Sequence, residues 1–287
     1  MAHGKTITIF WVDGTPDGII TGELSGWNGM CVKLPRDQIN SKREELEYPG
    51  VYFLICTDTE DGEDAVYIGE SDNLRTRLNQ HIANYKMGNE SYYWQSVVAF
   101  SSNSLNKALV KYLENRLVMI AKDSKRYKVL TKATSPKMHL KEHEIDSMEQ
   151  FIENIKTLLT ALNYRILEEL PQKAELKESA SNTTRTMLYI STKETSGSGY
   201  LTPDDKFVLC KGSTIKAHPS KACAKAALKK RENLIEDGVI VDNTLMDDVL
   251  VSSSSLAASL ITGFSTSGPE WWKTKDGISL KELQMKE

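Results

Sequence analysis

Residues 50–55, GVYFLI, and residues 65–69, AVYIG, are the stretch from which the rest of the chain can be interpreted. Both are short runs of β-branched and aromatic residues, which are typical of buried strands. The polar segment between them contains Gly62, which gives the backbone the freedom to reverse direction. The two runs therefore predict an antiparallel hairpin in which each strand carries one tyrosine.

A helix is predicted directly after this hairpin, over residues 70–83. An apolar residue recurs at every fourth position from Leu74 to Ile82, and Arg77 and His81 lie one turn apart. The two tyrosines, the arginine and the histidine come from three adjacent elements. Their polar groups can therefore converge on one point.

These motifs resemble the GIY-YIG nuclease family, whose two tripeptides are written here as residues 50–52, GVY, and residues 67–69, YIG. The family places an arginine ten residues after the second tyrosine and a histidine or tyrosine four residues later. It also places a metal-binding glutamate on a later helix. The matching residues of this chain are Arg77, His81 and Glu114, and the resemblance implies an α+β fold with a small antiparallel sheet flanked by helices.

The resemblance implies a chemical role for each matched residue. Glu114 would hold Mg²⁺ or Mn²⁺, because hard cations prefer carboxylate oxygen. Arg77 would bind the phosphate, since a guanidinium matches phosphate geometry. Proton transfers would fall to Tyr52, Tyr67 and His81, and a nearby cation would ease the loss of a tyrosine proton. Which of these three is the general base stays open.

Two neighbours of the second tripeptide bear on substrate binding. Gly69 has no side chain and would let a phosphate backbone approach closely. Glu70 stands where some relatives carry lysine. A carboxylate there repels phosphate unless it helps to hold metal or water, so the substrate geometry is expected to differ from that of those relatives.

Each of these residues also has an ordinary structural interpretation. A strand tyrosine is usually a core or sheet-face residue, and charged residues on a helix are usually solvated. It is the combination, in order and at the right spacings, that favours an active site.

Composition and charge limit the possible classes of protein. No apolar run is long enough to span a bilayer, and no secretory segment follows Met1. The four cysteines form no C-x-x-C pair, so free thiols in a reducing cytoplasm are expected rather than structural zinc.

The net charge of −3 is low for a nucleic-acid binder, but basic residues cluster within residues 105–130 and 211–231. Local basic faces matter more for phosphate binding than the total charge does. Solvated helix faces are the alternative explanation. The residues expected to contact substrate are Gly69, Lys107, Lys111, Lys225 and Lys229.

The chain is predicted to have four parts. Residues 1–46 form a small β-unit, and residues 47–167 form the nuclease domain with its following helix. The polar residues 168–186 form a linker, and residues 187–287 form a second α+β domain. That last part resembles a domain of uncharacterised function often fused to bacterial GIY-YIG nucleases, and its ending resembles modules attached to restriction-modification proteins. Two roles for residues 187–287 stay open: a scaffold and a DNA-binding module.

Several local features are predicted within these parts. A third strand over residues 92–100 pairs beside the hairpin, Ser104 or Asn103 caps the helix of Glu114, and a further helix covers residues 147–164. In the last part, two strands surround a Gly/Ser-rich loop, followed by a helix over residues 221–236 and a short helix capped within residues 252–255. The remaining expectations concern single side chains: Trp11 and Trp27 pack, Trp271 and Trp272 fill a core, and His139 and His143 lie on the surface.

The sequence thus predicts a cytoplasmic, metal-dependent endonuclease with a C-terminal targeting domain. Its substrate is expected to be DNA because the family is mostly DNA-directed, while RNA stays open since none of these residues distinguishes a 2′-hydroxyl. The alternative is a non-catalytic or partner-activated nucleic-acid-binding protein that retains the fold. A protein partner or a homo-oligomer is compatible with either, and no membrane association is expected.

Overall fold

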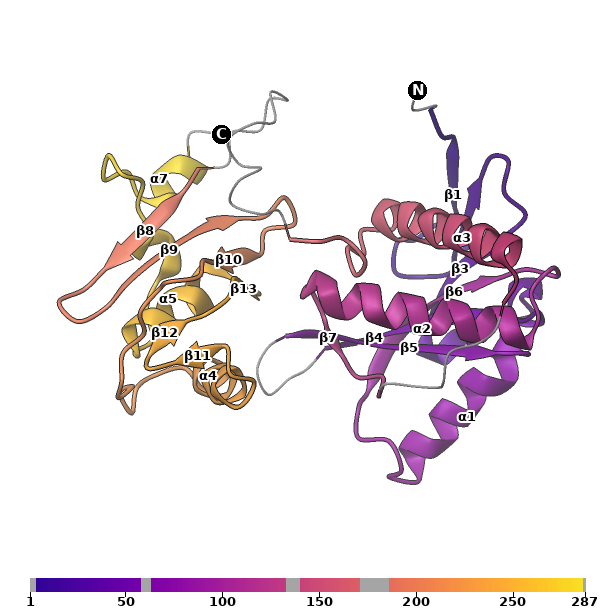
Figure 1. The fold of residues 1–287 in the computed structure, drawn as a ribbon, viewed down its shortest axis with the longest axis horizontal. Helices are drawn as coiled ribbons and strands as arrows, with labels where there is room; N and C mark the ends of the chain where they lie inside the picture. Colours follow the sequence, from indigo (N-terminus) through magenta and orange to yellow (C-terminus); the bar gives the residue numbers. More distant parts are fainter. Residues whose placement is uncertain (1–3, 58–62, 133–139, 171–185, 286–287) are drawn as a thin grey trace. The chain divides into compact units, whose positions relative to one another are not determined.

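The computed structural model describes residues 4–57, 63–132, 140–170 and 186–285. These residues form two compact units (Figure 1): residues 4–57 with 64–170 make the first, and residues 186–285 together with Glu63 make the second. His139, most of the turn predicted over residues 58–64 and most of the predicted linker lie outside the described residues. None of the helices within the described ranges is long and apolar enough to cross a membrane.

The first unit is built on a seven-stranded sheet with the spatial order β1-β2-β3-β6-β4-β5-β7. Every neighbouring pair is antiparallel except β5 and β7, which run parallel. In chain order the strands are β1 (Ile7–Trp11), β2 (Ile20–Leu24), β3 (Met30–Pro35), β4 (Gly50–Thr57), β5 (Asp64–Ser71), β6 (Trp94–Ser101) and β7 (Lys128–Val129).

The predicted hairpin is strands β4 and β5, and β6 pairs with the other side of β4 as expected. The predicted α+β fold is therefore confirmed, but the sheet is larger than a small hairpin sheet. Strand β3 pairs with the free side of β6 along its whole length, so β1–β3 continue the same sheet. Trp27 packs against Phe151, whereas Trp11 lies on the edge strand and stays 48% exposed, contrary to its expected packing role.

Three helices cover the sheet of the first unit: α1 (Leu74–Lys86), α2 (Lys107–Ser124) and α3 (Glu142–Ala161). Short 3-10 turns, η1 (Arg36–Gln38) and η2 (Glu44–Leu46), join β3 to β4. Helix α1 begins four residues later than predicted. Glu70 and Ser71 still pair with β4, and the Asn73 side chain then accepts a hydrogen bond from the Thr76 backbone N–H as the helix cap.

The starts of α2 and α3 also differ from the prediction. Asn106, rather than Asn103 or Ser104, caps α2 by accepting from the backbone N–H groups of Ala108 and Leu109. The Ser104 hydroxyl instead bonds to that of Ser102. Helix α3 begins at Glu142 instead of residue 147, because the Glu144 side chain accepts from the backbone N–H of Lys141 and closes the first turn.

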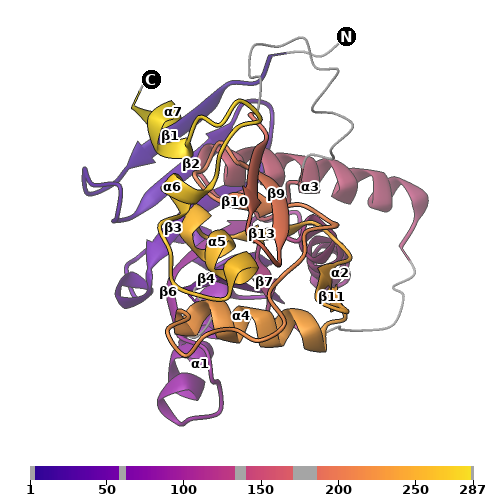
Figure 2. The same cartoon turned by 90° about the vertical axis from the view of Figure 1, so that its left-hand side faces the viewer.

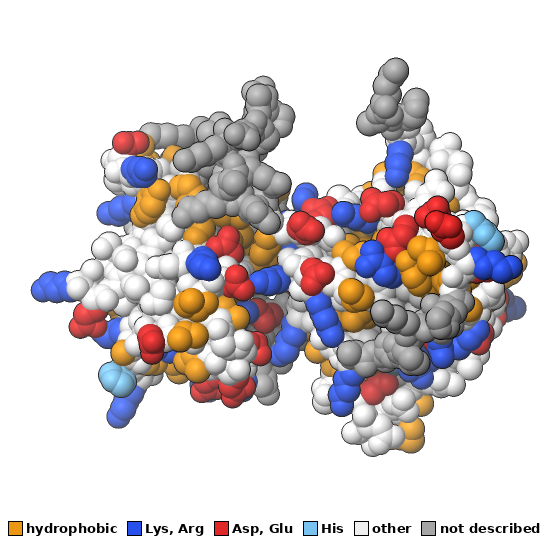
Figure 3. All heavy atoms as spheres, viewed as in Figure 1, with side chains coloured by type: hydrophobic (Ala, Val, Ile, Leu, Met, Phe, Trp, Pro, Cys, Tyr) orange, Lys and Arg blue, Asp and Glu red, His pale blue; other side chains and the backbone are white. Residues whose placement is uncertain are grey.

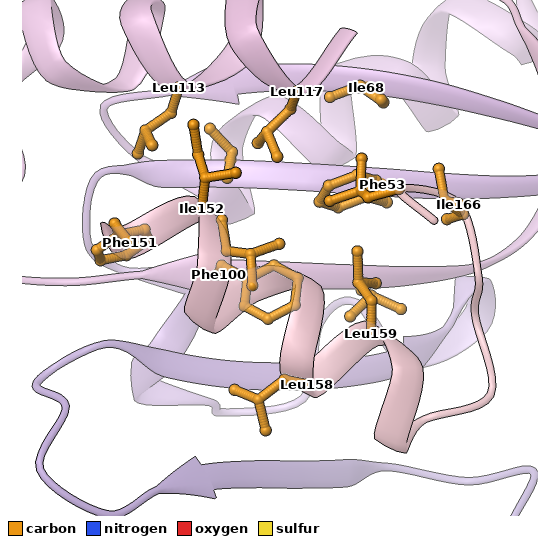
Figure 4. Close-up of a cluster of buried hydrophobic side chains, with 14 of the residues drawn as sticks. Phe53, Ile68, Phe100, Leu113, Leu117, Phe151, Ile152, Leu158, Leu159 and Ile166 are labelled. Carbon is orange, nitrogen blue, oxygen red and sulfur yellow. The ribbon is translucent and has the colours of Figure 1, made fainter. Parts of the chain in front are cut away.

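Alternate side chains of the central strands enter two separate cores. Phe53 and Phe100 point to the side covered by α2 and α3, where they meet Leu113, Leu117 and Ile152 (Figure 4). Tyr52, Leu54 and Val97 point to the opposite side, where Leu74 and Leu78 of α1 pack against them. The two faces follow from the two-residue period of a strand.

The second unit contains a four-stranded antiparallel sheet with the order β13-β10-β9-β8. The segment predicted as a Gly/Ser-rich loop contains strand β9, because its glycines fit where side chains would not. A Cβ on Gly199 would lie 2.3 Å from the Val208 carbonyl oxygen and 2.4 Å from the Phe207 ring. The strands of this unit are β8 (Leu188–Ser191), β9 (Ser196–Leu201), β10 (Phe207–Leu209), β13 (Val249–Val251) and the small pair β11 (Ile240–Val241) and β12 (Thr244–Leu245).

Helix α5 (Ser254–Thr262) packs on β9, β10 and β13 (Figure 2). Its cap is Ser253, which confirms the predicted capping by the serine run. Trp272 is fully buried and its indole N–H donates to the Ser254 carbonyl, whereas Trp271 is 37% exposed and does not fill the core. The other helices are α4 (Lys225–Glu236), which starts four residues later than predicted, α6 (Gly268–Trp271) and α7 (Leu280–Gln284).

Candidate active site

A pocket of about 540 Å³ is lined by residues of β4, β5, α1 and α2 in the first unit. It contains four of the five residues that the sequence indicates for catalysis: Tyr52, Tyr67, Arg77 and Glu114. The other residues that line it are Glu70, Ser71, Asp72, Asn73, Thr76, Gln80, Lys107 and Lys111. The structure therefore gathers side chains from residues that are widely separated in the chain, from Tyr52 to Glu114.

The strand register places the two tyrosines on the same face of the sheet. Tyr67 pairs with Leu54, two residues along the strand from Tyr52, and the two tyrosine rings stack with centroids 6.3 Å apart. Burial, reinforced by Tyr67, raises the pKa of Tyr52, although Arg77 acts in the opposite direction. Burial likewise raises the pKa of Tyr67 against the effect of Arg77. The arginine alone therefore does not make either phenol a stronger acid than usual.

Gly69 is buried and is not among the residues that line this pocket, so its contact with substrate stays a prediction. A Cβ at this position would lie 2.4 Å from the Tyr52 hydroxyl oxygen and 2.9 Å from the Tyr67 ring. Those distances are too short for a carbon atom. Gly69 therefore makes room for the tyrosine side chains that approach the pocket.

Arg77 connects the tyrosines to the open side of the pocket. Its Nε donates to the Tyr52 hydroxyl oxygen at 3.3 Å, and its Nη1 donates to Gln80 Oε1 at 3.2 Å. It also interacts with the Tyr67 hydroxyl. A guanidinium held in this way presents a fixed positive charge to an anion that enters the pocket.

His81 lies behind the pocket rather than in its wall. Its side chain is only 1% exposed, and its Nε2 lies 2.8 Å from the Tyr52 hydroxyl oxygen. Its Nδ1 lies 2.8 and 3.0 Å from the two carboxylate oxygens of Glu90. Sequence reasoning missed Glu90, because this residue follows the helix in an irregular segment and has no motif spacing that marks it.

Glu114 is the carboxylate that faces the pocket from α2. Its side chain forms no hydrogen bond and no ion pair with any residue that the structure describes. Burial and the neighbouring Glu70 raise the pKa of Glu114 to about 7, although Lys107, Arg77 and Lys111 oppose this shift. A partly buried carboxylate without a protein partner, close to a second one, fits a divalent cation.

Water would complete the coordination of such a cation. Among the described residues there is no group of three or more His, Cys, Asp or Glu side chains that could hold a metal ion. Mg²⁺ often binds through one or two carboxylates and keeps several of its waters. The residues present therefore fit a weakly held Mg²⁺ or Mn²⁺ rather than a closed structural site.

Glu70 is neutralised by a neighbouring lysine, which reduces the repulsion expected between this carboxylate and phosphate. The Lys107 Nζ lies 2.8 Å from Glu70 Oε2 and 3.6 Å from Asp72 Oδ2. Lys107 is thus already engaged by two acids. Lys111 also lines the pocket and forms no ion pair within the described part of the chain, so it is the freer of the two predicted lysines.

Parts of both predicted basic segments have structural roles. Arg126 is buried and its Nε donates to the Glu168 carbonyl oxygen. In the second unit Lys230 and Arg231 are buried, and Arg231 donates to the Ala217 carbonyl oxygen. Lys225 is exposed, while Lys229 lies 3.7 Å from Glu232. On the face shown in Figure 3, acidic and basic side chains are interspersed over each unit.

Comparison with known families agrees with this geometry. Residues 48–130 match the family described as the GIY-YIG catalytic domain, and residues 188–284 match the domain of unknown function DUF4357. The first range contains every residue of the pocket and also His81 and Glu90. No curated protein and no solved structure matched the chain.

Proposed function

The chain carries a catalytic domain of the GIY-YIG nuclease family, and on this basis we propose that it is a metal-dependent endonuclease that hydrolyses phosphodiester bonds in DNA. The observation that supports this most directly is the Glu114 carboxylate. It has no partner among the described residues, and it lines the same pocket as Arg77 and the two tyrosines.

Glu114 would hold the Mg²⁺ or Mn²⁺ ion of this nuclease. When bound, such a cation supplies Lewis acidity toward a phosphoryl oxygen and makes water a better nucleophile. Its charge would also relieve the repulsion between Glu114 and Glu70, which now contributes to the raised pKa of Glu114.

The residues of the chain itself would orient the phosphate and move protons. Arg77, fixed by Tyr52 and Gln80, would bind a phosphate oxygen, and Lys111 would add a second positive charge. Both tyrosines line the pocket, where Tyr67 is partly exposed and Tyr52 is buried. We assign the proton transfers to their hydroxyl groups and to His81 behind them.

The second unit would bind DNA and bring it to the catalytic domain. Lys211, Lys221 and Lys225 support this role, because each is exposed in a segment that lacks acidic residues. Lys230 and Arg231 are buried, so the surface that could face phosphate is smaller than the sequence alone suggests.

Nicking of supercoiled plasmid tests the nuclease assignment. The full chain should nick DNA with Mg²⁺ or Mn²⁺ and not with EDTA. Glu114→Gln should lose about 100-fold or more of this activity, as expected when several kcal/mol of metal stabilisation is removed. DNA binding by the variant should persist. Glu153→Gln, an exposed glutamate of α3, is the matched control and should cleave normally.

Two results would contradict the assignment. Equal cleavage by wild type and Glu114→Gln would show that the metal site lies elsewhere or that the activity is a contaminant. Tight binding without cleavage by the wild type, under all metals, would favour a binding protein that has kept the fold.

A further inference from the structure

Glu90 reaches His81 because the chain turns sharply after helix α1. The helix ends at Lys86, and Gly88 adopts a left-handed conformation with φ +76°. The backbone N–H of Asn89 then donates to the Asn84 carbonyl oxygen at 2.9 Å, which directs the chain back along the helix. Asn84 Nδ2 donates to Glu90 Oε1 at 3.2 Å and helps to hold the carboxylate beside the imidazole.

The Glu90 contact determines where the proton of neutral His81 lies. An ionised carboxylate can only accept hydrogen bonds, so the imidazole must donate through Nδ1. The Nε2 atom then has a lone pair and no proton. It accepts from the Tyr52 hydroxyl at 2.8 Å, and the Tyr52 oxygen keeps its lone pairs for Arg77 and for the pocket.

We infer that Glu90 is a positioning residue of the active site, which holds the His81 proton on Nδ1 so that Nε2 can take the proton of Tyr52. This inference rests on the proposed nuclease function. It extends that function by joining Tyr52, His81 and Glu90 into one line of hydrogen bonds that leads away from the pocket.

The proton transfer balances within these groups and one water molecule. The water gives a proton to the Tyr52 oxygen while the Tyr52 hydroxyl proton moves to His81 Nε2. One O–H bond of water and one of tyrosine break, and a new O–H bond and an N–H bond form. The resulting hydroxide forms a new P–O bond as the P–O bond to the leaving oxygen breaks, and the released alkoxide takes a proton from solvent. The imidazolium of His81 is compensated by the Glu90 carboxylate and returns its proton through Tyr52 after the reaction.

The surroundings of His81 keep it neutral before this transfer. The groups that face it are Glu90, Tyr52, Tyr67, Arg77 and Arg36. Burial lowers the pKa of His81 below its ordinary value, and Arg77 and Arg36 act in the same direction, while Glu90 opposes them. Removal of the Glu90 charge should therefore lower the pKa of His81 further.

The test uses the full chain and has two separate readouts: the tautomer and pKa of the His81 imidazole, and the rate of DNA cleavage. Nitrogen-15 NMR reports the tautomer and the pKa of each histidine, with the His81 signal identified by its loss in His81→Gln. The variants are Glu90→Gln, which removes the charge, and Glu90→Asp, which keeps it. Glu149→Gln is the control, because that carboxylate accepts from Tyr112 and Arg116 away from the pocket.

The expected results are specific. Wild-type His81 should carry its neutral proton on Nδ1. Glu90→Gln should lower the pKa of His81, shift the acid limb of the cleavage profile to lower pH with it, and reduce cleavage at neutral pH by about 10- to 100-fold. Glu90→Asp should restore part of the activity, and Glu149→Gln should change none of these readouts.

Other results would overturn the inference. A wild-type proton on Nε2, or the same His81 pKa in wild type and Glu90→Gln, shows that Glu90 does not position the histidine. An acid limb that stays fixed while the His81 pKa moves shows that His81 takes no proton in the reaction. Absence of cleavage by the wild type overturns the proposed function instead, and the NMR result still decides whether Glu90 fixes the tautomer.

Discussion

Glu114 is destabilising when it is ionised, because burial and the neighbouring Glu70 outweigh the attraction of Lys107, Arg77 and Lys111. Its carboxylate has no hydrogen bond or ion pair in the described structure. Its pKa is about 7 in the folded protein, against an ordinary value of 4.5 for the unfolded chain. Between these two values the folded protein binds more protons than the unfolded chain. The free energy of unfolding therefore falls as pH rises through this window.

The variant Glu114→Gln removes this penalty. In EDTA it should be more stable than wild type by about 1 kcal/mol at pH 8, a figure reduced for the solvent that reaches this side chain. At pH 4 the two proteins should be equally stable, since the wild-type carboxyl is then protonated. Urea unfolding at both values of pH measures the difference.

Metal provides the control for this prediction. Mg²⁺ at concentrations well above its dissociation constant should stabilise the wild type and leave Glu114→Gln unchanged, because only the carboxylate binds the ion. A variant that is less stable than wild type at pH 8 in EDTA would show that the carboxylate is favourably placed without metal.

At the scale of single elements, helix α2 determines where Glu114 lies, and its start depends on Asn106. The side chain of Asn106 accepts from two backbone N–H groups of the first turn. Asn106→Ala should therefore lower the free energy of unfolding by about 1 kcal/mol. Asn103→Ala, at the position that the sequence indicated as a possible cap, should change it by less than about 0.5 kcal/mol.

Thermal and urea unfolding of these two variants separate the two caps. The observed cap would be contradicted if both variants lost the same free energy of unfolding, or if Asn103→Ala lost more than Asn106→Ala. Cleavage by Asn106→Ala should fall as well, since a frayed first turn releases Lys107 from Glu70 at the edge of the pocket.

In the whole molecule, each hydrophobic cluster of described residues belongs to one unit alone. The two clusters on the faces of the first sheet contain residues from 19 to 167, and the cluster of the second unit contains residues from 188 to 280. Each unit thus buries its own apolar side chains and satisfies the requirement for independent folding.

A chain truncated after Leu170 should therefore fold and keep its metal-dependent cleavage. If the second unit binds DNA, this truncation should weaken binding and reduce the slope of log Kd against log salt by about 0.9 for each phosphate that the second unit neutralises. Filter binding over a range of salt concentrations measures both quantities. Unchanged affinity and slope would make the second unit a scaffold instead.

Local sequence patterns were enough to predict the hairpin, the helix of Arg77 and His81, and a short helix over residues 256–261 capped by the preceding serine run. These features depend on local periods: alternate residues of a strand share a face, and residues four apart on a helix lie together. The motif spacing therefore predicted that Tyr52, Tyr67 and Arg77 share one side of the hairpin and its helix. The structure places them in one pocket with Glu114.

The contacts between groups that are distant in sequence follow from the tertiary structure. Glu90 meets His81 through a glycine turn, Lys107 of one helix neutralises Glu70 of a strand, and Arg231 is buried although its neighbours in sequence suggest a basic surface. These contacts depend on where the chain returns in space. The periodicity of apolar residues does not predict these contacts, because the packing of the helices on the sheet determines which distant residues meet.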